Sequence, residues 1–205
     1  MPLAITMDMS HQLLLTDAID NCIYMYNYGT WNEITYSGNY SLNIPGSIAV
    51  DQDENIYVAD FLNQRICKID RNRKVEVLNQ ISCRKPYGIF VHENSLYTAC
   101  EEMANIQKMN LNTNQNEKIV EGYKPIAITL DSNGNIFFSE NRKIYFYHKK
   151  EKRTTLLLDK RIWKSYSFPW LAHIGALVSV AEDKLIFSDT IRNRIYELKI
   201  SNLEK

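Results

Sequence analysis

The sequence predicts an all-β protein, a β-propeller of about five four-stranded blades. Three observations support this prediction. A short apolar strand recurs about every 40 residues, each copy is followed by further short strands separated by polar turns, and no segment shows a sustained helical period. Four short strands in a repeat of this length are typical of a propeller blade.

The innermost strand of each repeat is a nearly continuous run of apolar and small residues. Its copies start at residues 2, 45, 86, 125 and 174, and all but the last start with Pro. Such a run is expected of a strand that is buried on both faces, as the inner strands of a propeller are. The chain is therefore predicted to be a single domain, 1–205, with repeats at roughly 2–44, 45–85, 86–124, 125–173 and 174–205.

The second strand of each repeat ends in a column of mainly acidic residues, which reads Asp17, Asp60, Cys100, Glu140 and Asp189. A carboxylate at this position can accept hydrogen bonds from the backbone of the tight turn that follows. We interpret the column as a set of turn caps, with a shared ligand or cation site as the alternative. The third and fourth strands follow within a few residues, and the fourth is the most variable.

The fifth repeat stops after its third strand, at Ile200 to Lys205. This leaves three possibilities: a three-stranded last blade, an open arc that a partner completes, or a chain that is part of a larger protein. Of these we favour a closed ring of five blades with a three-stranded last blade.

The second repeat carries a family resemblance. Residues 45–60 read Pro-Gly-Ser-Ile-Ala-Val-Asp-Gln-Asp-Glu-Asn-Ile-Tyr-Val-Ala-Asp, and Asn-Gln-Arg-Ile follows at residues 63–66. This string resembles an NHL repeat, and the similarity extends to the fourth and fifth repeats. The third repeat leans toward the related YWTD repeat, and gluconolactonase and strictosidine-synthase-like propellers are also related. The resemblance implies a propeller, usually of six blades, for which about 250 residues would be needed.

Function does not follow from this resemblance, because such propellers include scaffolds, RNA binders, lyases and lactonases. A lactonase-like calcium site would need a Glu, two Asn and an Asp on the axis, and no such set can be placed in the repeats. A zinc site of the lyase kind would need several equivalent His. The four His of this chain lie at non-equivalent positions of the repeat, namely His11, His92, His148 and His173.

Composition narrows the possible partners. The 205 residues include 24 Lys and Arg and 24 Asp and Glu, so the formal net charge is zero. Phosphate binding normally requires a basic surface, which argues against nucleic acid as the partner. No run is long and apolar enough to span a membrane, and the first residues show neither a basic leader nor an apolar signal segment. We therefore expect a cytoplasmic protein without a membrane anchor.

The four cysteines form no Cys-x-x-Cys pair and have no His at metal-ligand spacing. We expect reduced residues of the core or the loops at Cys22, Cys67, Cys83 and Cys100. One disulfide, from Cys83 to Cys100, is the alternative in an oxidising compartment.

A second column lies where the inner strand meets the first turn, and it contains Asp8, Asp51, His92 and Asp131. Carboxylates that converge around a propeller axis could ligate a divalent cation, calcium or zinc. However, Asp is also a common former of tight turns, and we weight that interpretation more heavily.

The longest irregular segment, residues 160–173, lies between the fourth and fifth repeats. Its aromatic residues Trp163, Tyr166, Phe168 and Trp170 stand beside Lys164 and other basic residues. Aromatic anchors with cationic neighbours are typical of protein interfaces. The alternative is a loop that folds back to plug the channel or to seal the ring.

The sequence shows no nucleophile elbow, phosphate loop or His-Glu-x-x-His motif. The leading prediction is therefore a non-catalytic interaction module without a cofactor, which binds a protein or peptide through its rim. Self-association or incorporation into a larger assembly is a further possibility. The alternative is a metal-dependent hydrolase or lyase, lactonase-like, with Asp8, Asp51, His92 and Asp131 as ligands in the axial channel.

Overall fold

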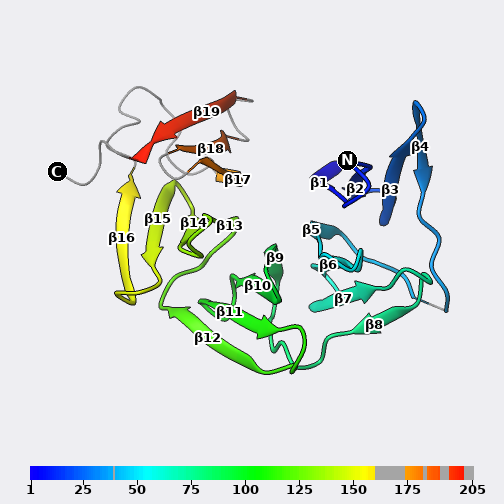
Figure 1. Cartoon of the computed structure of the whole chain (residues 1–205), viewed down its shortest axis with the longest axis horizontal. Coiled ribbons are helices and arrows are strands. Elements are labelled where there is room, and N and C mark those ends of the chain that lie inside the picture. The colour runs from blue at the N-terminus through cyan, green and yellow to red at the C-terminus, as the bar shows by residue number, and fades with distance from the viewer. Residues whose placement is uncertain (39, 160–173, 182–183, 190–193, 201–205) are drawn as a thin grey trace.

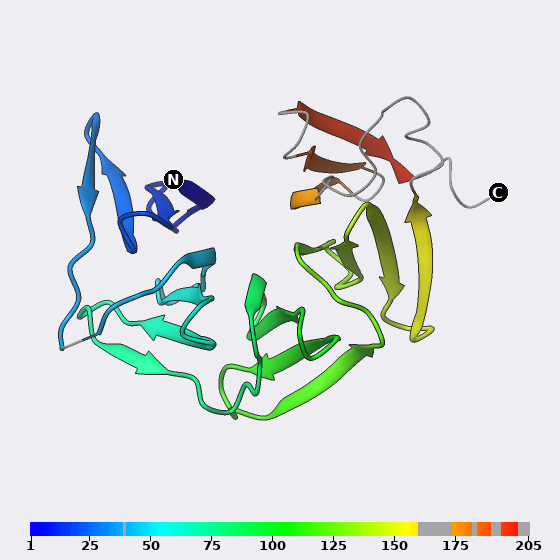
Figure 2. The same cartoon turned by 180° about the vertical axis from the view of Figure 1, so that it is seen from behind.

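A computed structural model (Figures 1 and 2) describes residues 1–38, 40–159, 174–181, 184–189 and 194–200. Four sheets of four strands and one sheet of three strands follow one another along an arc. No helix among these residues is long and apolar enough to cross a membrane. The predicted all-β propeller of about five blades is confirmed, including the three-stranded last blade.

Each sheet is one blade, and its strands are consecutive in the chain. Blade 1 comprises β1 (Pro2–Met7), β2 (Leu13–Asp17), β3 (Cys22–Asn27) and β4 (Thr30–Glu33). Blade 2 comprises β5 (Pro45–Val50), β6 (Ile56–Asp60), β7 (Arg65–Ile69) and β8 (Val75–Val77). Blade 3 comprises β9 (Pro86–His92), β10 (Ser95–Cys100), β11 (Asn105–Asn110) and β12 (Asn116–Glu121). Blade 4 comprises β13 (Ile128–Leu130), β14 (Ile136–Glu140), β15 (Lys143–His148) and β16 (Arg153–Leu158), and blade 5 comprises β17 (Ile174–Ala181), β18 (Lys184–Asp189) and β19 (Arg194–Lys199).

The lowest-numbered strand of every blade lies toward the centre of the arc, and the highest-numbered strand lies at its outer edge (Figure 1). All strand pairs within the blades are antiparallel. The second strands are the most deeply buried, as in β6 and β10, where every residue is buried. Burial on both faces explains why these strands are rich in apolar residues instead of alternating with polar ones.

The hydrophobic core lies between the blades. Each of four clusters combines the second and third strands of one blade with the first three strands of the next. We call the face that a blade turns toward the following blade its forward face, and the opposite one its backward face. For example, Leu14 and Ile23 on the forward face of blade 1 pack against Ile48 and Ile56 on the backward face of blade 2.

Blades 3 and 4 approach each other closely at Gly88. A Cβ atom at this position would lie only 2.5 Å from the backbone oxygen of Ile126. Ser47 and Ala127 occupy the same place in the inner strands of blades 2 and 4. Blade 3 therefore requires glycine for the close contact with its neighbour, and not for an unusual backbone conformation.

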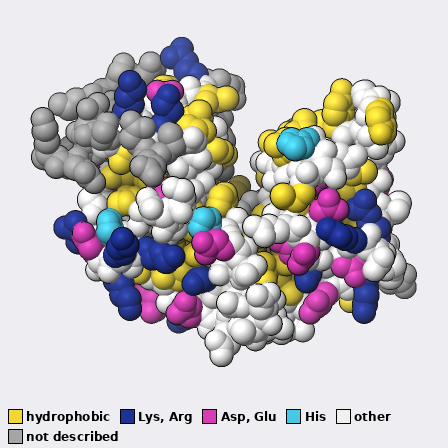
Figure 3. Space-filling view, viewed as in Figure 1, with side chains coloured by type: hydrophobic (Ala, Val, Ile, Leu, Met, Phe, Trp, Pro, Cys, Tyr) yellow, Lys and Arg dark blue, Asp and Glu magenta, His cyan; other side chains and the backbone are white. Residues whose placement is uncertain are grey.

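The expected closed ring is wrong for the described residues. Blades 1 and 5 are separated by an open gap, which forms a deep notch in the space-filling view (Figure 3). The packing of blade on blade that fills every other boundary is missing there. Among the described residues, the blades thus form an open arc.

The close approach at Gly88 yields a prediction. Gly88→Ala should lower the free energy of unfolding by about 1–3 kcal/mol, because the added methyl group forces blades 3 and 4 apart. The matched control is Ser47→Ala, which removes only the hydrogen bond from Ser47 Oγ to the Ile89 oxygen, 3.3 Å, and should cost less. Urea unfolding of both variants checks this, and equal costs would contradict it.

Candidate functional site

The connections between blades and the turns from second to third strand lie at the same edge of the arc. We call this edge the connection rim. It comprises the turns 18–21, 61–64, 101–104 and 141–142, and the connections 34–44, 78–85 and 122–127. The last residue of each second strand, the column noted in the sequence, lies directly beneath this rim. Its side chains determine how the connections are held.

Asp60 illustrates the hydrogen bonds that residues of this column accept. Its carboxylate is completely buried and accepts hydrogen bonds from the Asn43 backbone N–H (2.7 Å), from Asn63 Nδ2 (2.9 Å) and from Arg65 Nε (2.7 Å). Arg65 also donates to the Ser41 oxygen, at 3.0 Å. A buried carboxylate with this number of charge-assisted partners fixes the connection just before the inner strand of its own blade.

Glu140 holds blade 4 in the same way. Its Oε1 accepts the Lys124 N–H at 2.8 Å, just before the inner strand of that blade, and its Oε2 accepts the Tyr145 hydroxyl at 3.3 Å. In blade 1 the Asp17 carboxylate accepts the N–H groups of Ile19 and Asp20 from the following turn. The predicted capping of the following turn by backbone N–H groups is thus seen in blade 1, whereas in blades 2 and 4 the carboxylate accepts a backbone N–H group of the preceding connection. The Asp189 side chain lies outside the described residues.

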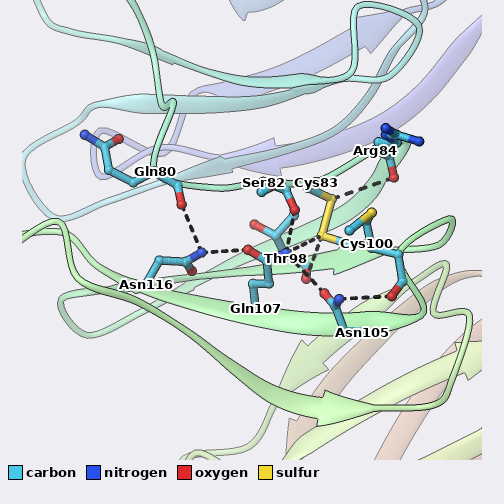
Figure 4. The surroundings of a disulfide bond; sticks show 10 residues. Gln80, Ser82, Cys83, Arg84, Thr98, Cys100, Asn105, Gln107 and Asn116 are labelled. Atoms are coloured by element: carbon cyan, nitrogen blue, oxygen red, sulfur yellow. Dashed lines mark hydrogen bonds between the residues drawn. A yellow bond between two sulfur atoms is a disulfide. The ribbon is translucent and has the colours of Figure 1, made fainter.

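Blade 3 has a covalent bond where the other blades have a carboxylate. Cys100 ends the second strand and forms a disulfide with Cys83, which lies in the connection 78–85, with the two Cα atoms 5.3 Å apart (Figure 4). The disulfide therefore joins the same two parts of the blade that Asp60 joins through hydrogen bonds. The prediction that Cys83 and Cys100 are reduced is wrong, and the alternative disulfide is correct.

Side-chain amides reinforce this covalent link (Figure 4). Gln107 Nε2 donates to the Ser82 oxygen at 2.7 Å, and Asn116 Nδ2 donates both to the Gln80 oxygen at 3.0 Å and to Gln107 Oε1 at 2.6 Å. These bonds run from the third and fourth strands of blade 3 to the connection. The connection 78–85 is thus held to blade 3 along most of its length.

The turns of the connection rim expose apolar side chains. Ile19, Leu62 and Met103 each lie in a four-residue turn of blades 1, 2 and 3, and all three are exposed. Beneath them, the Phe61 ring packs edge to face on the Tyr87 ring, with 5.3 Å between the centroids. These residues were not predicted from the sequence, although an apolar residue inside each of these three polar turns was visible once the repeats were aligned.

The predicted interface residues Trp163, Tyr166, Phe168, Trp170 and Lys164 lie outside the described residues. The two strands that flank them are described. β16 ends and β17 begins at the connection rim.

The predicted metal ligands Asp8, Asp51 and Asp131 lie at the opposite rim, in the turns from first to second strand. Each Oδ1 accepts two backbone N–H groups of its own turn, two and four residues further on. Asp70, in a turn from third to fourth strand, makes the same two bonds, 2.8 and 2.9 Å long. This geometry is therefore a general turn cap of the fold.

The second oxygens of two of these carboxylates also have protein partners. Asp51 Oδ2 accepts Asn55 Nδ2 at 2.8 Å and the Tyr57 hydroxyl at 2.9 Å, and Asp131 Oδ2 accepts Asn135 Nδ2 at 2.8 Å. The fourth candidate, His92, ends β9, and its Nε2 lies 4.0 Å from Glu93 Oε1. Among the residues that the structure describes, no three His, Cys, Asp or Glu side chains are placed to hold a metal ion.

The remaining cysteines, Cys22 and Cys67, are free thiols in the core. Burial raises the pKa of Cys67 to about 11, and burial also raises the pKa of Cys22 above its ordinary value. Because the thiolate is the reactive form, both side chains are protected from reagents at neutral pH by burial and by protonation. Neither is a candidate nucleophile.

Comparison with known proteins identifies the repeat. Residues 42–69 match the NHL repeat, which is the region of the second repeat that carries the motif. No curated protein sequence matches the chain. The chain is therefore a β-propeller whose second repeat is an NHL repeat.

Solved structures share the fold at low sequence identity. A virginiamycin B lyase from Staphylococcus aureus, solved as a catalytically inactive variant with quinupristin, is 16% identical, with a TM-score of 0.72 over 97% of this chain. This chain spans 66% of the length of that lyase. The structure of a nidogen/laminin complex contains a chain that is 16% identical, with a TM-score of 0.79, covering 99% of this chain and 77% of that one. At these identities the similarity concerns the fold alone.

The disulfide leads to a prediction about thiol titration. The native protein should show no reactive thiol, the unfolded protein two, and the unfolded and reduced protein four. Raising the pH toward 9 should not expose Cys67, because its folded-state pKa of about 11 keeps the neutral thiol dominant. Titration with a chromogenic thiol reagent checks this, and four thiols without reductant would exclude the disulfide.

Metal removal tests the axial-site alternative. We expect a chelator to leave the melting temperature unchanged, because the carboxylates of Asp51 and Asp131 already accept N–H or O–H groups. Elemental analysis and thermal melts with and without EDTA check this. Stoichiometric calcium or zinc, with a fall of more than about 4 °C on its removal, would contradict the expectation. The variant Asp51→Ala with Asp131→Ala would then show whether these residues are the ligands.

Proposed function

We propose that this chain is a non-catalytic protein-binding propeller that recognises a protein or peptide partner through its connection rim. The observation that carries the proposal is the row of exposed apolar side chains, Ile19, Leu62 and Met103, in consecutive blades of that rim. Exposed apolar residues grouped on a rigid support are typical of interaction sites. In the nidogen/laminin complex, a propeller of similar fold occurs in a structure with a protein partner.

The rigidity of the rim supports the same proposal. Asp60, Glu140 and the Cys83–Cys100 disulfide hold the connections to their blades, so little conformational entropy is lost when a partner binds. Loops held by a rigid scaffold commonly carry binding function. The segment 160–173 connects β16 to β17, which end and begin at the same rim, and we assign Trp163, Tyr166, Phe168, Trp170 and Lys164 to the same interface.

The disulfide also bears on the compartment. Disulfides persist in oxidising environments and are rare in the cytosol. The disulfide closes a loop with a sequence separation of 17. Closing a loop of this length raises the free energy of unfolding by about 3 kcal/mol, because it restricts the unfolded chain. We therefore propose that the protein functions in an oxidising compartment, instead of the cytoplasm expected from the sequence. The thiol titration above tests the disulfide on which this proposal rests.

Substitutions at the rim test the binding function. Leu62→Asp and Met103→Asp should each weaken partner binding about tenfold or more, because a charge replaces an apolar contact. Trp163→Ala with Trp170→Ala should do the same. The partner is first identified by mass spectrometry of proteins retained on the immobilised chain, and its affinity for each variant is then measured.

The matched control is Tyr28→Asp, because Tyr28 is 98% exposed but lies at the opposite rim, in the turn between β3 and β4. This variant should bind normally. If the rim variants remain folded by circular dichroism and bind like the wild type, the connection rim is not the interface. Loss of binding in Tyr28→Asp alone would place the interface at the opposite rim.

A further inference from the structure

The two sides of the gap expose side chains that are buried in every other blade. On the backward face of blade 1, Ile5 is 57% exposed, whereas the equivalent residues Ile48, Ile89 and Ile128 are 5%, 3% and 5% exposed. On the forward face of blade 5, Ile195 is 77% exposed, and its four equivalents, Ile23, Ile66, Ile106 and Ile144, are at most 1% exposed.

The face of blade 1 is apolar across all four strands. One row of paired residues contains Met7, Leu13, Tyr26 and Trp31, and the Tyr26 and Trp31 rings lie against each other with 5.1 Å between their centroids. The neighbouring row contains Ile5, Leu15 and Tyr24 and ends at Glu33 in the outermost strand. Yellow side chains border the notch on both of its sides in the space-filling view (Figure 3). A continuous apolar sheet face of this kind marks an interaction surface.

The internal repeat shows what fits these faces. At each of the four existing boundaries, a forward face packs on a backward face, as Leu14 and Ile23 pack on Ile48. Among the described residues, no blade packs on the forward face of blade 5, which carries Val178 and Ile195, or on the backward face of blade 1, which carries Ile5 and Met7. The chain therefore contains the complement of each of its own exposed faces, but the gap keeps the two apart within one copy (Figure 2).

Charge does not oppose contact between copies. The forward face of blade 5 also carries Glu197, which pairs with Lys184 at 3.3 Å. The same position is occupied by Lys68 and Lys108 in blades 2 and 3, where both are half-buried at blade boundaries. A charged residue there is thus compatible with the packing of blades. The formal net charge of zero removes long-range repulsion between copies.

We propose that a second copy of this chain covers the gap faces, with the forward face of blade 5 of one copy packed on the backward face of blade 1 of the next. The contact is head-to-tail, so each copy retains one free forward and one free backward face after a single association. The surface is separate from the connection rim, and the proposal does not depend on the proposed function.

Two complementary variants test this arrangement in the full chain. Ile5→Asp disables the backward face of blade 1, and Ile195→Asp disables the forward face of blade 5. Both residues are exposed, so neither change should lower the melting temperature of the monomer. Sedimentation velocity of the wild type should show association that grows with protein concentration, and each variant alone should associate about 30-fold more weakly.

Mixing the variants gives the decisive result. The Ile5→Asp chain still has an intact forward face and the Ile195→Asp chain an intact backward face, so an equimolar mixture should form a dimer and stop there. Leu156→Asp, at an exposed residue of the outer strand β16 of blade 4, is the matched control and should associate like the wild type. Association that survives in one variant, or a mixture that stays monomeric, would overturn the head-to-tail contact.

The other possible occupants give different results. A wild-type chain that is monomeric at all concentrations would overturn the proposal. If Ile5→Asp and Ile195→Asp then each lower the melting temperature and their effects are not additive, blade 5 closes on blade 1 within one copy. If neither changes the melting temperature of that monomer, the faces are left for a blade supplied by a different protein.

Discussion

The rest of the structure depends on the bond between the end of each second strand and the connection that precedes the inner strand of the same blade. Asp60 and Glu140 make this bond with backbone N–H groups, and Cys100 makes it with Cys83. It fixes where the inner strand starts, and hence how the next blade stacks. It also brings the turns and the connections to a common rim, so the exposed side chains of that rim are presented by a fixed support.

Much of the fold was predictable from the sequence, because the repeat imposes the same strand pattern and the same end column on every blade. The role of Cys100 was harder to predict, since its identity as a substitute for Asp60 follows only from the bond that it forms. The exposure of Ile5 and Ile195 was not predictable, because both lie in the same local pattern as their buried equivalents. Burial there depends on whether a neighbouring blade exists, which local sequence does not encode.

The candidate site was predicted only in part. The sequence drew attention to acidic residues at both rims, and the structure shows that Asp51 and Asp131 serve their own turns, as Asp70 does. Spacing alone therefore did not distinguish an Asp that caps its own turn from an Asp that ligates a metal ion. The exposed Leu62 and Met103 were missed because single apolar residues in turns are common and acquire meaning only when neighbouring blades place them at the same rim.

An open arc of blades has two ends, and these ends determine where unfolding starts. Each inner blade is supported on both faces, whereas blades 1 and 5 are supported on one. In such a linear array, fraying starts at the termini and advances by nearest-neighbour steps. Blade 3 lies in the middle of the array and contains the disulfide, so we expect it to unfold last under heat or mechanical tension. Local stability is thus expected to rise from the two terminal blades toward the central one.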